Sequence, residues 1–101
     1  MALLFGGKIT AAIPTEFAYH SNYPNPFNAT TTFSYDVPRE SEVRIVIYDP
    51  TGREVARPVT GVWAAGCQRV TFDAGRLPSG MYLVRMSASD FHATGKMLLL
   101  K

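Results

Sequence analysis

Short runs rich in β-branched and aromatic residues, each closed by a turn signal, constrain the fold more than any other feature of this chain. Alternate residues of such a run point to opposite faces of a strand, as Phe33 and Tyr35 do against Ser34. No apolar pattern of helical period persists for the roughly 12 residues that a stable helix needs. Including a short lead-in, the expected strands are residues 16–19, 31–37, 43–48, 54–59, 68–73, 81–88 and 92–101.

The connections between these runs are too short for a parallel sheet, whose crossovers need a dozen or more residues. Pro50 and Gly52 mark one tight turn, and Pro78 and Gly80 mark another. We therefore predict an all-β fold, an antiparallel β-sandwich of about seven strands.

The chain has 101 residues, which is enough for one small domain. We expect residues 1–13 to be a linker or an appended segment and residues 14–101 to form the domain. The 10 basic and 8 acidic residues are spread thinly, so we expect no concentrated basic face for a nucleic acid. No apolar run approaches the roughly 20 residues that span a bilayer, and the N-terminal residues make a poor signal peptide.

No combination of side chains predicts a catalytic, cofactor or metal site. His20 and His92 lie outside any nucleophile motif, and Cys67 has no second cysteine for a disulfide or a zinc site, so we expect it to be a small, half-buried residue. The carboxylates expected at strand ends are Asp36, Asp49, Asp73 and Asp90. We expect these isolated residues to stabilise turns, because calcium needs several oxygen ligands, commonly at close spacing. The sequence thus favours a protein that is not an enzyme.

Aromatic residues beside the proline-rich turn leave two interpretations open. Tyr19, Tyr23 and Phe27 could form an exposed platform of the kind that a carbohydrate-binding module uses. The other interpretation is that Phe27 fills the open end of the sandwich. Asn28 matches a glycosylation acceptor pattern, although an Asn in this position also stabilises a turn.

Four motifs in a fixed order resemble a known family. They are NYPNPFNATTTFSYDVP, VRIVIYDPTGREV, TFDAGRLPSGMYLVRM and TGKMLLLK. Together they are similar to the type A C-terminal sorting domain of the type IX secretion system of Bacteroidetes, over residues 14–101. The immunoglobulin-like domain of flagellar hook-capping proteins shares the early motifs but usually lacks the last two segments. One departure is Ala29, where the family usually has a third proline.

The resemblance implies an immunoglobulin-like sandwich at the C-terminus of a longer exported protein. In the family the tail passes from the periplasm to the outer-membrane translocon, and a sortase often removes it and attaches the cargo to the cell surface. The implied partners are the translocon, the sortase and an N-terminal cargo domain, and the implied location of the cargo is the cell surface or the medium. The competing interpretation is a carbohydrate-binding or cell-attachment sandwich appended to a secreted enzyme.

The resemblance also assigns residues. The export-critical end segment consists of Lys96, Met97, Leu98, Leu99, Leu100 and Lys101. The shared turn motifs consist of Pro24, Asn25, Pro26, Phe27, Asn28, Gly52, Arg53, Pro78, Ser79, Gly80 and Tyr82. We expect the end segment to be an edge strand with unpaired amides and carbonyls, which a translocon component would capture by strand addition. The same edge would alternatively pair with a second copy in a weak dimer.

Overall fold

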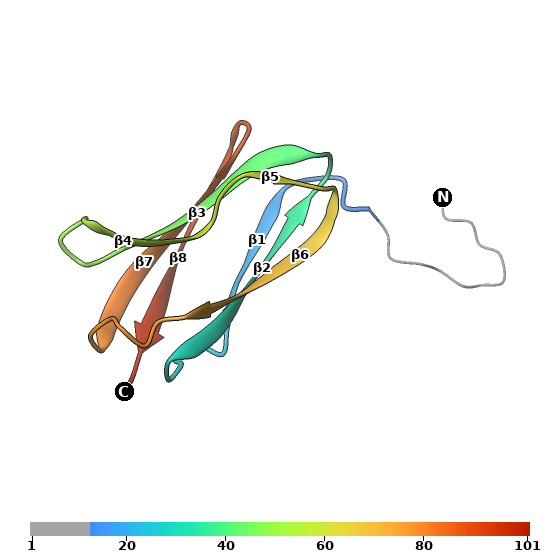
Figure 1. The fold of residues 1–101 in the computed structure, drawn as a ribbon. Helices are drawn as coiled ribbons and strands as arrows, with labels where there is room; N and C mark the ends of the chain where they lie inside the picture. Colours follow the sequence, from blue (N-terminus) through green and yellow to red (C-terminus); the bar gives the residue numbers. More distant parts are fainter. Residues whose placement is uncertain (1–12) are drawn as a thin grey trace, which may run out of the picture.

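The computed structural model describes residues 13–101, which form eight β-strands (Figure 1). The strands are β1 (Ala18–Tyr23), β2 (Thr30–Val37), β3 (Ser41–Tyr48), β4 (Glu54–Val59), β5 (Val62–Trp63), β6 (Gly66–Asp73), β7 (Gly80–Ala88) and β8 (Phe91–Leu99). The predicted all-β fold is confirmed, and the described residues include no helix that is long and apolar enough to cross a membrane. Apart from Ile13, the predicted linker over residues 1–13 lies outside the described residues.

The strands form two antiparallel sheets that lie as two layers (Figure 1). One sheet has the order β1-β2-β6, and the other has the order β4-β3-β7-β8, with β5 pairing to β3. Each pairing between neighbouring strands is antiparallel, as their short connections predict. The predicted sandwich is confirmed, and the immunoglobulin-like label is compatible with this arrangement. In this topology β8 is the last strand of its sheet.

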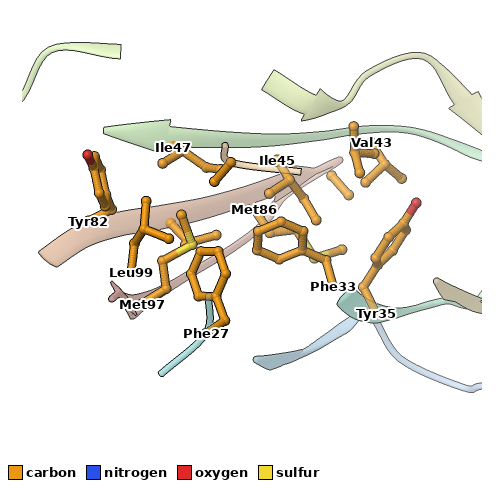
Figure 2. Close-up of a cluster of buried hydrophobic side chains, with 14 of the residues drawn as sticks. Phe27, Phe33, Tyr35, Val43, Ile45, Ile47, Tyr82, Met86, Met97 and Leu99 are labelled. Carbon is orange, nitrogen blue, oxygen red and sulfur yellow. The ribbon is translucent and has the colours of Figure 1, made fainter. Parts of the chain in front are cut away.

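Because successive side chains of a strand point to opposite faces, one face of each sheet packs into a common core (Figure 2). In β2 the buried residues alternate with half-buried polar ones, and in β7 they alternate with exposed ones. The core side chains come from both sheets, from the turn before β2 and from the turn after β6. They are Phe27, Phe33, Tyr35, Val37, Val43, Ile45, Ile47, Val59, Ala74, Tyr82, Val84, Met86, Ala88, Met97 and Leu99.

Two hairpins follow the sequence expectation closely. Strand β4 has the predicted bounds and pairs with β3 across the turn after Tyr48, with irregular register. Strands β7 and β8 pair without interruption from Gly80 opposite Leu99 to Ala88 opposite Phe91. Short loops hold each pair together, which explains why local signals were sufficient to predict them.

Two other elements differ from the prediction. The lead-in strand was expected at residues 16–19, whereas β1 covers Ala18–Tyr23 and contains a register shift between Tyr19 and Asn22. Ser21 within it has φ 69, which interrupts the alternation that the sequence pattern would need. The two residues of β5 were missed because their pairing to Ser41 and Glu42 is too short to produce a periodic pattern.

Candidate functional site

The end segment, defined as residues 96–101, contributes to the core and to the surface in alternation. Met97 and Leu99 are fully buried, and Figure 2 shows both beside Phe27 in the core. Lys96 is exposed and Leu98 is half-buried on the opposite face, while Leu100 is 50% exposed after the end of β8. The segment is therefore built into the folded domain.

Over the end segment, the turn that contains Asn25 and Phe27 forms hydrogen bonds with the outer edge of β8. The Asn25 Nδ2 amide donates to the Lys96 carbonyl at 3.0 Å, and the Leu98 N–H donates to Asn25 Oδ1 at 3.0 Å. The Phe27 N–H donates to the Leu98 carbonyl at 3.0 Å, and the Leu100 N–H donates to the Phe27 carbonyl at 2.9 Å. Phe27 thereby forms an isolated parallel bridge with Leu99. The Asn25 side chain substitutes for the backbone of a neighbouring strand.

This pairing corrects the expectation that the end segment presents an unpaired edge. The outward backbone groups of Lys96, Leu98 and Leu100 named above already have partners. Strand addition at these positions would first have to displace the turn. The prediction was wrong because Asn25 and Lys96 are 71 residues apart in sequence, and no local pattern reports such a contact.

The proline-rich turn is itself held by buried polar groups. Pro24 and Pro26 supply no backbone N–H, so the turn depends on side-chain donors. The Pro24 carbonyl accepts from Thr31 Oγ1 at 2.8 Å and from Asn22 Nδ2 at 3.3 Å, and the same amide also donates to Thr31 Oγ1 at 3.0 Å. Because Asn22 and Thr31 are only 4% and 1% exposed, these bonds are shielded from water and fix the turn to β1 and β2. The role of Asn22 was not predicted from the sequence.

The turn ends at Ala29, the departure from the family pattern. Ala29 has φ 77, a left-handed conformation that the proline ring excludes. Its carbonyl accepts the Ala74 N–H at 2.6 Å, which joins this turn to the residue after β6. Proline at this position would therefore need a different backbone path.

The aromatic residues near the turn do not form a platform. Phe27 is only 3% exposed, so it fills the end of the core, as the second interpretation predicted. Tyr19 is half-buried beside Phe33, with ring centroids 6.5 Å apart, and burial raises its pKa to about 12. Tyr23, at 81% exposed, stands without the other two rings of the predicted surface. The structure thus removes the observation that favoured a carbohydrate-binding module.

The turn after β6 contacts the other end of the segment. Ser79 Oγ accepts the Lys101 N–H at 3.0 Å, and the Lys101 Nζ amine donates to the Gly75 carbonyl at 2.7 Å. Tyr82, which is buried at the start of β7, donates its hydroxyl proton to the Pro78 carbonyl at 2.5 Å, and burial raises its pKa. Two of the predicted turn motifs are therefore brought together with the end segment, one on each side of it.

The third predicted turn motif is stabilised locally. Asp49 Oδ1 accepts the Thr51 N–H and hydroxyl at 2.9 and 2.6 Å and the Arg53 N–H at 3.0 Å, and these bonds lower the pKa of the carboxyl. Gly52 has φ +91, which disfavours any residue with a Cβ. The prediction that Asp49 stabilises a turn is confirmed. No hydrogen bond joins this turn to the end segment within residues 13–101.

The remaining reactive side chains do not gather into a site. Asp36 pairs with His20 at 2.8 Å and lies opposite Cys67 in the β2–β6 register. Desolvation and the Asp36 carboxylate raise the pKa of the Cys67 thiol, which disfavours the reactive thiolate. Cys67 is exposed, so the expectation that it is half-buried was wrong. The described part of the chain holds no group of three or more His, Cys, Asp or Glu residues suited to a metal ion.

The Asn25 contacts lead to a stability prediction. Replacing Asn25 with Ala removes two hydrogen bonds to β8, and we expect the free energy of unfolding to fall by about 1–2 kcal/mol in denaturant titrations. The exposed Asn28→Ala variant is the control and should change this energy by less than about 0.5 kcal/mol. Amide hydrogen exchange at Leu98 should quicken in the Asn25 variant alone. Unchanged exchange at Leu98 would contradict the assigned contact.

The comparisons with known proteins identify a family. The family model described as "Secretion system C-terminal sorting domain" matches residues 21–100, which include the proline-rich turn and all but the last residue of the end segment. No curated protein and no solved structure matches the chain.

Proposed function

The chain belongs to the family of type IX secretion C-terminal sorting domains, and we propose that it is a non-catalytic sorting signal. In this proposal the domain directs a longer exported protein through the outer-membrane translocon to the cell surface or the medium.

The observation that carries this proposal is the way in which the matched motifs meet in space. The proline-rich turn pairs with the outer edge of the end segment, and the turn around Ser79 binds its terminal residue. Motifs that lie far apart in the chain are therefore parts of one folded unit, with the end segment between them. A signal built in this way is presented by the folded domain and has a defined shape.

A fusion experiment tests the proposal. The full 101-residue chain is joined to the C-terminus of a periplasmic reporter in a host with a type IX system. We expect the reporter outside the cell when both the domain and the translocon are present. The controls are the reporter without the domain, and the fusion in a strain that lacks the translocon. Equal amounts of reporter outside the cell in all three strains would refute the sorting function.

The family resemblance also implies that a sortase removes the domain after export. The same fusion tests this cleavage. If a sortase cleaves the tail, the external reporter is smaller than the fusion by about the mass of the domain, 11.1 kDa for the whole chain. An external reporter at the full fusion mass would contradict cleavage.

A further inference from the structure

The outer surface of β7 and β8 carries exposed apolar side chains next to the end segment. Met81 and Leu83 are 46% and 42% exposed, and they face outward on β7. In the register, Met81 lies opposite Leu98 and Leu83 lies opposite Lys96. Leu100, which follows the end of β8, is also 50% exposed. We call Met81, Leu83, Lys96, Leu98 and Leu100 the end-segment face.

This face is hollowed beside the proline-rich turn. A depression of about 260 Å³ is lined by Asn25, Pro26, Met81, Lys96, Met97 and Leu98. Its walls are a rigid turn and a paired strand, so the depression is preformed. A partner side chain of moderate size would fit it without rearranging the sheet.

The backbone of the end segment offers little to a partner here. Its outward groups at Lys96, Leu98 and Leu100 are bonded to Asn25 and Phe27, as described above. Met97 and Leu99 point into the core. A partner that meets the folded domain at this position therefore contacts side chains.

The charge around the face is positive and uncompensated. Strands β7 and β8 contain Arg85 and Lys96 but no Asp or Glu. Among residues 13–101 neither cation takes part in an ion pair, because the acidic partners found there serve His20, Arg53 and Arg57. Two copies packed through this face would bring the same cations together, which disfavours a homodimer. A surface complementary to this face would carry carboxylates around an apolar centre.

We propose that the end-segment face is the docking surface of the folded domain for the export machinery, and that the machinery presents aliphatic side chains bordered by carboxylates. This inference rests on the proposed sorting function and specifies how the signal is read. The end segment then serves two purposes with alternate residues: Met97 and Leu99 hold the fold, while Lys96, Leu98 and Leu100 meet the partner.

Surface substitutions in the reporter fusion test this inference. Met81→Lys places a charge in the apolar centre, and Lys96→Glu reverses the border charge. We expect each to lower the external fraction of reporter by about tenfold, since losing one apolar contact or one charge pair at an interface costs on the order of a factor of ten in affinity. The controls are Val62→Lys, an exposed apolar position on β5, and Arg69→Glu, an exposed cation on β6. Both should export like the wild type.

Thermal unfolding of each isolated variant separates docking from folding. The midpoints of all four variants should lie within a few degrees of the wild type, because the changed side chains are exposed. Wild-type export by folded Met81→Lys and Lys96→Glu variants would overturn the docking face while leaving the sorting function intact. A wild-type fusion that fails to export would refute the sorting function itself. Equal loss in the controls, or a dimer by light scattering that Met81→Lys dissociates, would also overturn the proposal.

Discussion

Removal of residues 96–101 is expected to abolish the cooperative unfolding transition of this domain. The deletion takes away Met97 and Leu99, both fully buried, and truncating a buried Met or Leu to Ala alone costs about 2–5 kcal/mol. The combined loss of about 4–10 kcal/mol is of the same order as the entire stability of a typical small domain, about 5–15 kcal/mol. Denaturant titration followed by circular dichroism provides the measurement.

The matched control changes the outward residues of the same segment. A chain with Lys96→Ala and Leu100→Ser keeps both core residues and should unfold with a midpoint close to that of the wild type. A shortened chain that unfolds cooperatively at the wild-type midpoint would show that the end segment is dispensable for the fold. This result bears on function, because a deletion that blocks export removes the signal and the folded domain together.

Replacement of Phe27 with Ala is expected to lower the free energy of unfolding by about 3–5 kcal/mol. Phe27 is 3% exposed and lies beside Met97 and Leu99 (Figure 2), so the smaller side chain leaves a cavity at the end of the core. Its backbone bonds to Leu98 and Leu100 also depend on the ring holding the turn in place. Equilibrium unfolding in urea provides the measurement.

Tyr23→Ala is the control for that experiment. Tyr23 comes from the same proline-rich stretch but is 81% exposed, and its replacement should change the free energy of unfolding by less than about 0.5 kcal/mol. Similar effects of the two substitutions would contradict the core position of Phe27. One of the two interpretations left open by the sequence placed both rings on an exposed platform, so this pair of variants also separates the two interpretations.

Local patterns predicted most of the strands. The alternation in residues 31–37 and 81–88 matches the buried and outward residues of β2 and β7 closely. Turn residues such as Pro50 and Gly52 marked the β3–β4 hairpin correctly. Elements without a clean period were misplaced or missed: β1 carries a register shift, and β5 has only two residues.

The candidate site was predicted in its parts, and its assembly was not. The family motifs in the sequence named Asn25, Phe27, Ser79 and the end segment. They did not show that Asn25 pairs with Lys96 and Leu98, nor that Ser79 binds Lys101. Met81 and Leu83 also escaped notice as neighbours of the end segment, because the register that sets them opposite Leu98 and Lys96 cannot be read from the alternation within either strand.

Alternating strands, tight turns and four ordered motifs identify this chain from its sequence as an all-β sandwich with the motifs of a sorting domain. The alternation of side chains along a strand and the residue preferences of turns involve residues that are close in sequence, so both can be recognised without a structure. Tertiary contacts set which strand edge is covered and which face of the sheet is open. Both depend on contacts across dozens of residues, where a hydrogen bond such as that from Asn25 to Lys96 leaves no periodic trace. The end segment, expected to offer its backbone, instead offers its side chains.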